Sequence, residues 1–161
     1  MRRLFFLSLS LIVLLTGSIF LTGCSRQKVA ASPDFSLRGL DGVTYTLSEQ
    51  EGKLVVLYFW AASCPPCVAK LPALAAMEEN LPDNVELWLV NLRDDEARIR
   101  NLVGQHPNLT VLLDGISTFL DYNFRFTPTV AFIGPGGQLL YSQPGMTQQQ
   151  IQGKINELAG N

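Results

Sequence analysis

The chain has 161 residues, an apolar content of 47%, a charged content of 16% and a formal net charge of −2. These values allow one globular domain with a core and a short appendage. Lysine and arginine occur singly apart from Arg2-Arg3, so nucleic-acid binding is not expected.

The appendage is the N-terminal segment 1–23, which has the pattern of a secretion signal. Arg2-Arg3 gives a positive start, and an almost unbroken apolar run of residues 4–21 follows. A permanent transmembrane anchor stays open as an alternative, because the run is about as long as a bilayer requires. Leu21-Thr22-Gly23-Cys24 resembles a lipobox, the signature of bacterial lipoproteins. This resemblance implies cleavage before Cys24 and acylation of its thiol.

The remaining chain divides into a tether, 24–32, and a domain, 33–161. The tether is small and polar and has no periodicity. Cleavage would leave 10 basic and 14 acidic residues, and Cys64 and Cys67 as the only free thiols. The expected location is the extracytoplasmic face of a bacterial membrane, with inner or outer membrane left open.

The domain alternates between strand and helix patterns, with a hairpin turn signal at Asp41-Gly42 near its start. Strands are predicted at 34–37, 43–46, 53–60, 85–91, 111–113, 129–133 and 138–142; a helical turn is predicted at 48–50, and helices at 68–79, 94–105, 116–123 and 147–158. Pro72 should kink the first of these helices. This order predicts an α/β fold with a central mixed sheet, helices on both faces and an N-terminal β-hairpin.

Cys64-Pro65-Pro66-Cys67 lies at a predicted strand-to-helix junction. Two thiols at this spacing can close into a disulfide and reopen, which suits exchange with other disulfides. A helix N-terminus favours negative charge, so Cys64 is predicted to be the nucleophilic thiolate. Cys67, one turn into the helix, is predicted to be the buried resolving thiol.

The segment from Phe59 to Cys67 resembles the active site of thioredoxin-like proteins, and is most similar to the extracytoplasmic TlpA/ResA group. Thr127-Pro128-Thr129 resembles that group's cis-proline loop, Asp34-Phe35 its usual domain start and Gly136-Gly137-Gln138 its final hairpin. The resemblance covers about 32–159. It implies a thioredoxin-like fold, a thiol-disulfide oxidoreductase activity and a Pro128 that faces the two cysteines.

The same resemblance assigns further roles. Substrate contacts are expected from Trp60, Ser63, Pro65, Pro66 and Thr127. Asp94 is a candidate proton relay, although a helix cap or a solvated charge is an open alternative.

Two residues depart from the pattern, and a third has no assigned role. Ser63 stands where thioredoxins carry Trp, and Tyr58 stands where they carry a buried Asp. Tyr58 is a poor proton acceptor near neutral pH, since an unperturbed phenol has a pKa of about 10. Arg125 is open between surface charge and substrate contact.

Other uses of the cysteine pair are less favoured. Zinc would need about two further ligands, and His106 is the only histidine. A copper carrier would need a histidine near Thr127, and a permanent disulfide in so small a loop would stabilise little. No metal or cofactor is expected.

The predicted function is a membrane-tethered reductase of protein disulfides, in cytochrome c maturation or a related thiol-repair pathway. The resemblance implies a transmembrane thiol donor, and a monomer is expected. A disulfide-forming oxidase of the same fold and a non-catalytic binding lipoprotein remain alternatives.

Overall fold

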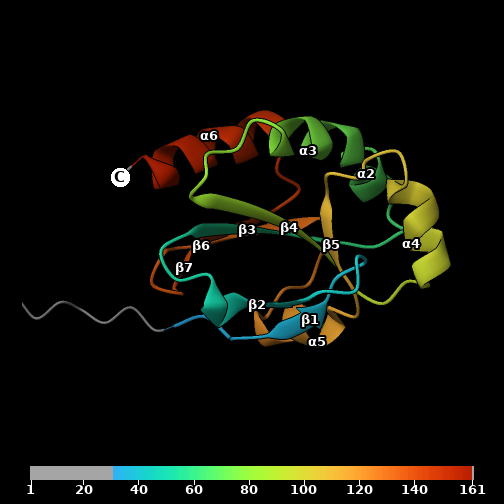
Figure 1. The fold of residues 1–161 in the computed structure, drawn as a ribbon, viewed down its shortest axis with the longest axis horizontal. Coiled ribbons are helices and arrows are strands. Elements are labelled where there is room, and N and C mark those ends of the chain that lie inside the picture. The colour runs from blue at the N-terminus through green and yellow to red at the C-terminus, as the bar shows by residue number, and fades with distance from the viewer. Residues whose placement is uncertain (1–30, 161) are drawn as a thin grey trace, which may run out of the picture.

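The computed structural model describes residues 31–160, and within them five strands form one mixed sheet in the order β5-β4-β3-β6-β7 (Figure 1). The strands are β3 (Leu54–Trp60), β4 (Val85–Asn91), β5 (Thr110–Leu112), β6 (Thr129–Ile133) and β7 (Leu139–Pro144). β3 pairs in parallel with β4 and antiparallel with β6. The predicted mixed sheet is therefore confirmed, with β3 at its centre.

The centre of the sheet is apolar because both of its faces are covered. Every residue of β3 is buried. Leu54, Val56 and Tyr58 face one core, whereas Val55 and Leu57 face the other. A strand covered on both sides reads as a continuous apolar run, which explains why β3 was predictable from sequence.

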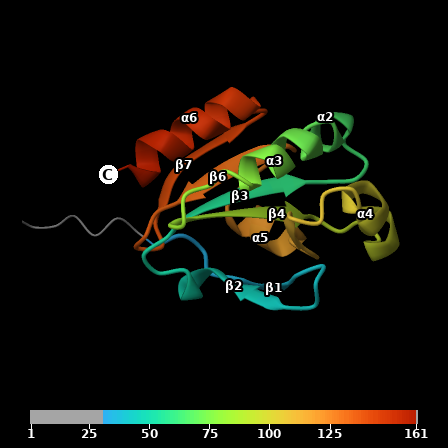
Figure 2. The same cartoon turned by 45° about the horizontal axis from the view of Figure 1, so that its top comes forward.

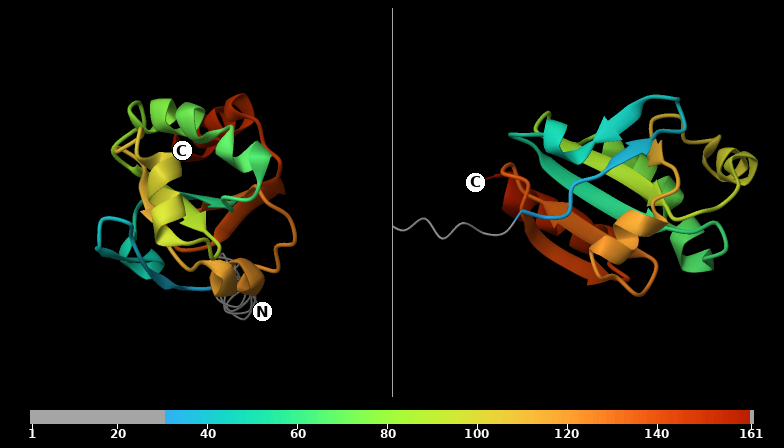
Figure 3. Two further views of the ribbon diagram at one scale, coloured as in Figure 1. Left: turned by 90° about the vertical axis from the view of Figure 1, so that its right-hand side faces the viewer. Right: turned by 90° about the horizontal axis from the view of Figure 1, so that it is seen from below.

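Helices cover both faces, as predicted. α3 (Leu71–Glu78), α4 (Glu96–Val103) and α6 (Gln148–Ala159) bury apolar residues in one core. α5 (Ile116–Asp121) lies against the opposite face (Figure 2). That face is also covered by the hairpin of β1 (Ser36–Arg38) and β2 (Thr44–Thr46), which is followed by the 3₁₀ turn η1 (Leu47–Glu49). Figure 3 shows this hairpin beside α5 when the molecule is seen from below.

The helix predicted at 68–79 is in fact two helices. α2 (Pro65–Val68) is a single turn, and α3 begins after Ala69 and Lys70. Pro72 occupies the start of α3 rather than the middle of a kinked helix. Proline is tolerated in the first turn of a helix, but in the interior of a helix it removes a backbone hydrogen bond. The helix is therefore interrupted before Pro72, and a new helix begins there.

Side-chain caps mark where α4 and α6 begin. Asp95, not Asp94, caps α4 by accepting hydrogen bonds from the N–H groups of Ala97 and Arg98. At α6, Thr147 Oγ1 accepts from Gln150 N at 3.2 Å, and Gln150 Oε1 accepts from Thr147 N at 2.8 Å. The capping box of Thr147 and Gln150 is thus complete.

The start of the described chain is attached to the domain. Ala31 forms a bridge with Gln138, and Ser32 N donates to the carbonyl oxygen of Gly137 at 2.9 Å. The predicted signal segment 1–23, Cys24 and the tether up to residue 30 lie outside the described residues. Within 31–160, no helix has the length and apolar character needed to cross a bilayer.

Candidate active site

The two cysteines lie where β3 gives way to α2. Cys64 is the N-cap of α2, and its carbonyl oxygen accepts from the N–H groups of Cys67 and Val68 at 3.0 and 3.1 Å. Pro65 and Pro66 occupy the first helical positions, where no N–H donor is required. This turn brings the cysteine Cα atoms to 5.3 Å, and the two sulfurs form a disulfide.

The two cysteines differ in exposure. Cys67 is completely buried, whereas Cys64 is partly exposed. Only the sulfur of Cys64 can therefore be reached by a disulfide from outside, and this agrees with the roles predicted for the pair. The helix behind Cys64 is one turn long, so the peptide dipoles that would stabilise its thiolate are few.

The loop before β6 forms the other side of the site. The Thr127–Pro128 peptide bond is cis, as predicted. The carbonyl oxygen of Thr127 lies 3.7 Å from Cys64 Sγ. The antiparallel pairing of Phe59 with Thr129 brings the two segments together, although they are far apart in sequence. Pro128 itself is buried.

A polar network fixes the loop between β3 and Cys64. Asp94 Oδ2 accepts from Ala62 N at 2.6 Å and from Asn91 Nδ2 at 2.9 Å. Asn91 is fully buried, and its Oδ1 accepts from Asp94 N at 2.9 Å. On the other side of the peptide, Arg98 Nη2 donates to Ala62 O at 3.2 Å. Both backbone groups of Ala62, two residues before Cys64, are held.

Next to this network, the chain makes a close approach at the end of β4. Gly115 N donates to Asn91 O at 2.8 Å, and a Cβ at Gly115 would lie 2.2 Å from Val90 Cγ1. A side chain there would force the start of α5 away from β4. No local sequence pattern predicts this contact, because Asn91 and Gly115 are distant in the chain.

Asp94 is bonded to the loop that leads to Cys64, through its hydrogen bonds with Ala62 and Asn91. Asp94 thus holds the backbone of Ala62, a contact that was not predicted from the sequence. Its role as a proton relay remains a prediction. The alternative that Asp94 caps the helix is wrong, because Asp95 does so.

The two aromatic residues on β3 are core residues. Trp60 has no exposed surface, so the substrate contact expected from it is wrong. The indole faces the core formed with α3 and α6, where its Nε1 has no hydrogen-bond partner among residues 31–160. Tyr58 is also fully buried, and its hydroxyl donates to Cys67 O at 3.1 Å. Burial raises the pKa of Tyr58 above its usual value.

The exposed residues around Cys64 include three that were expected to meet substrate. Ser63, Pro65 and Pro66 are exposed, and Thr127 is partly exposed. Phe126, which sequence reasoning passed over, is 70% exposed. The sequence feature that could have pointed to Phe126 is its position directly before the Thr127–Pro128 pair.

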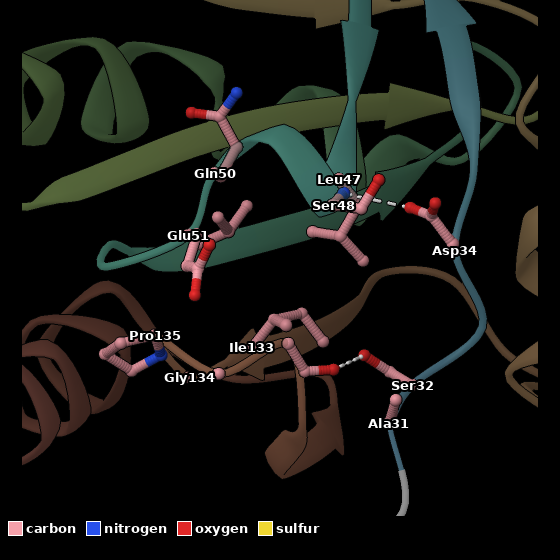
Figure 4. Close-up of a pocket in the computed structure, with 13 residues that line it drawn as sticks. Ala31, Ser32, Asp34, Leu47, Ser48, Gln50, Glu51, Ile133, Gly134 and Pro135 are labelled. Carbon is pink, nitrogen blue, oxygen red and sulfur yellow. Dashed lines mark hydrogen bonds between the residues drawn. The ribbon is translucent and has the colours of Figure 1, made fainter.

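A hollow elsewhere on the surface is separate from this site (Figure 4). It is lined by residues around Val55 and Ile133, at the opposite end of β3 from Phe59 and Thr129. Its volume of about 220 Å³ is below the roughly 300–1,000 Å³ of typical small-molecule sites. We assign it no part in the cysteine chemistry.

Metal-ligating side chains do not gather in the described part of the chain. No group of three or more histidine, cysteine, aspartate or glutamate residues there could hold a metal ion. His106 is partly buried in the turn after α4, where its backbone N–H donates to the carbonyl oxygen of Val103 at 2.7 Å.

Known proteins share both the sequence pattern and the fold. The pattern of the family described as Redoxin matches residues 27–157. The thiol-disulfide oxidoreductase ResA of Bacillus subtilis (strain 168) is 29% identical over 166 residues, covering 96% of this chain and 93% of the relative. That of Oceanobacillus iheyensis is 31% identical over 137 residues, covering 80% of this chain and 71% of the relative. The crystal structure of the pneumococcal exposed lipoprotein thioredoxin Etrx1, from Streptococcus pneumoniae strain TIGR4, is similar with a TM-score of 0.70. Its sequence is 35% identical, and the match covers 78% of this chain and 100% of that one.

The sheet order and the disulfide beside a cis-proline define a thioredoxin-like protein. The chain belongs to the Redoxin family, and it is a thiol-disulfide oxidoreductase.

Proposed function

We propose that this protein reduces protein disulfides outside the cytoplasm while tethered to a bacterial membrane by lipid on Cys24. The observation that carries the exchange chemistry is the difference in exposure between Cys64 and Cys67. An accessible sulfur joined to a buried one can be attacked or released at one atom only, which orders the two steps of exchange.

The cycle starts from the dithiol. The Cys64 thiolate attacks one sulfur of a client disulfide; that S–S bond breaks, and the other client sulfur leaves as a thiolate that takes up a proton. Cys67 then loses its proton and attacks Cys64 Sγ, which releases the second client thiol. The client gains two electrons, and the Cys64–Cys67 disulfide forms.

The cis-proline loop would orient the client. Thr127 O lies 3.7 Å from Cys64 Sγ, so an extended client segment that reaches this sulfur must pass the Thr127 backbone. Backbone pairing of this kind binds extended peptides without demanding one sequence. Because Pro128 has no N–H donor, the backbone groups of the loop that can pair with a client are those of Thr127.

The direction of electron flow is supported by the resemblance of the active-site segment to reductases of cytochrome c maturation. A reductase in an oxidising compartment needs electrons from across the membrane, and a transmembrane thiol protein is the donor class we propose. The decisive measurement is the reduction potential of the Cys64–Cys67 couple against glutathione. A potential below that of glutathione is expected, and one well above it would identify an oxidase instead.

Cysteine variants test the chemistry. Insulin reduction should be lost in both Cys64→Ser and Cys67→Ser. Cys67→Ser should in addition accumulate mixed disulfides with clients on Cys64, because the resolving attack is missing. Undiminished insulin reduction in both variants would end the case for catalysis by this pair.

The tether is tested separately by mass spectrometry of the protein purified from membranes of the bacterium that makes it. A mature chain that begins with diacylglyceryl-modified Cys24 is expected. An intact Met1 or an unmodified Cys24 would contradict the lipid anchor, and it would leave the exchange chemistry unaffected.

A further inference from the structure

Phe126 is an unusual side chain for the surface of this domain. It is 70% exposed, the highest value among the large hydrophobic side chains of the described residues. Phe124, two residues earlier, behaves differently: its ring lies 5.5 Å from that of Phe59 and joins the core below the sheet. Of the two phenylalanines in this loop, Phe124 thus packs against the core and Phe126 remains exposed to solvent.

The backbone at Phe126 is held in place. The buried Thr129 donates a hydrogen bond from Oγ1 to Phe126 O at 2.6 Å. The preceding Arg125 is held as well, because its guanidinium donates to Asn123 Oδ1 at 2.6 Å and to Phe124 O at 3.3 Å. Phe126 is thus presented from a fixed loop.

The position of Phe126 connects it to the redox centre. It directly precedes Thr127, whose carbonyl oxygen lies 3.7 Å from Cys64 Sγ. The two residues after Cys64 are Pro65 and Pro66, and both are exposed. A client that reaches Cys64 Sγ therefore meets two exposed prolines that follow the sulfur in the chain, and the loop that approaches the sulfur carries an exposed aromatic residue.

We propose that Phe126, with Pro65 and Pro66, forms a docking surface for a large apolar side chain next to the reacting cysteine of an extended client. The partner class is an unfolded or extended cystine-containing segment rather than a small polar disulfide. The proposal rests on the exchange activity proposed above and adds a selectivity to it. Apolar contact suits this surface because Arg125, the nearest charge in sequence, is already bonded to its own loop.

The docking step changes no bond. It raises the local concentration of the client cystine at Cys64 before the thiolate attacks, so it should accelerate the first exchange step only for clients that carry the apolar side chain. The second step, in which Cys67 attacks Cys64, takes place inside the protein and should not depend on Phe126.

Two peptide disulfides that differ at one position test the proposal. Each is a short peptide dimer joined through its cysteines, with either leucine or serine directly before the cysteine. The protein is reduced with dithiothreitol, freed of it, and mixed with each dimer under pseudo-first-order conditions. The wild type should react with the leucine dimer about fivefold faster than with the serine dimer, as expected for one partly buried apolar contact.

Substitutions assign this preference to Phe126. Phe126→Ala should bring the two rates within about twofold of each other, and Phe126→Leu should retain most of the preference. Leu140→Ala is the matched control: Leu140 is 40% exposed and lies beside Gly134, at the end of β6 away from Thr127. Hydroxyethyl disulfide, which has no side chain to dock, should react equally with every variant.

Three outcomes would overturn the docking surface. One is an unchanged preference in Phe126→Ala; another is an equal loss of rate with hydroxyethyl disulfide, which would show that Phe126 supports the site itself. The third is a wild type that reacts with hydroxyethyl disulfide but does not distinguish the dimers, which leaves the exchange function intact. A wild type that reacts with no disulfide would overturn the proposed function and the docking surface together.

Discussion

Tyr58 donates its hydroxyl hydrogen to Cys67 O at 3.1 Å and is fully buried, so it supports the helix that carries the resolving cysteine. Because burial raises the pKa of Tyr58 above its ordinary value, the phenol stays protonated through the neutral range. We expect Tyr58→Phe to lower the unfolding free energy by about 1 kcal/mol and to leave the pH profile of insulin reduction unchanged.

Urea unfolding and rates at pH 5 to 9 check both parts of this prediction. Tyr141→Phe is a suitable control, since that hydroxyl bonds to Gln143 on β7 and not to the active-site helix. A displaced pH midpoint in Tyr58→Phe, with Tyr141→Phe unaffected, would mean that Tyr58 takes part in proton transfer.

Asp94 allows a sharp test because one oxygen, Oδ2, accepts both of its side-chain hydrogen bonds. Asparagine can keep an oxygen at that place, whereas alanine removes the acceptor and frees Ala62 N. We expect Asp94→Ala to lower the unfolding free energy by about 2 kcal/mol and the exchange rate by about tenfold, because the Cys64 loop loses its anchor.

Asp94→Asn is the matched variant for this test. If Asp94 only positions the loop, the exchange rate of Asp94→Asn should stay within about twofold of the wild type at every pH from 6 to 9. An Asp94→Asn protein as slow as Asp94→Ala would instead show that the carboxylate charge is needed, as a proton relay requires.

Element boundaries in this protein are set by caps and prolines. At α6, the reciprocal bonds between Thr147 and Gln150 fix the first turn of the helix that packs Ile151 and Ile155 against the sheet. We expect Thr147→Ala to lower the unfolding free energy by about 1 kcal/mol, and Thr147→Ser, which keeps the hydroxyl, to change it by much less. Thermal and urea denaturation provide the measurement, and equal losses in both variants would contradict a capping role.

The elements also show where sequence patterns succeed. β4 and β6 have the predicted bounds, Val85–Asn91 and Thr129–Ile133, because strands buried on both faces are marked by continuous apolar residues. The division of the active-site helix into α2 and α3 was not predicted, since the proline pattern allows either a kink or a break.

At the scale of the whole molecule, one partly buried acid, Glu78, links stability to pH. Burial, and secondarily the negative charge of Glu86, raise the pKa of Glu78 to about 7. Glu86 is itself paired with Lys53 at 2.5 Å, and Glu78 Oε2 has no hydrogen-bond partner among residues 31–160. The folded state therefore holds a proton on Glu78 that the unfolded state releases near its ordinary pKa of about 4.5.

The sign of this linkage gives a prediction. The stabilisation is complete below about pH 4.5 and is lost as the pH rises through about 7, so the wild type should lose stability between pH 5 and 8. After allowance for partial exposure, the loss should be about 1–2 kcal/mol. Urea unfolding across this range should show a flatter profile for Glu78→Gln, whereas Glu79→Gln, at an exposed neighbour, should follow the wild type.

The sequence by itself determined the thioredoxin-like class, the central strands, the redox pair Cys64/Cys67 and the cis bond before Pro128. The strands were predicted from apolar runs that any fold must bury, the redox pair from its spacing, and the class and the cis bond from the resemblance of short motifs to a known family. Only the tertiary structure decided that Asp94, itself bonded to Asn91, accepts from Ala62 N, that Trp60 is wholly buried, and that the exposed Phe126 precedes the residue whose carbonyl oxygen lies 3.7 Å from Cys64 Sγ. Each of these depends on segments that are distant in the chain and meet only when β3 pairs with β4 and β6. Contacts and exposure of this kind are properties of the assembled sheet and have no signature in local sequence.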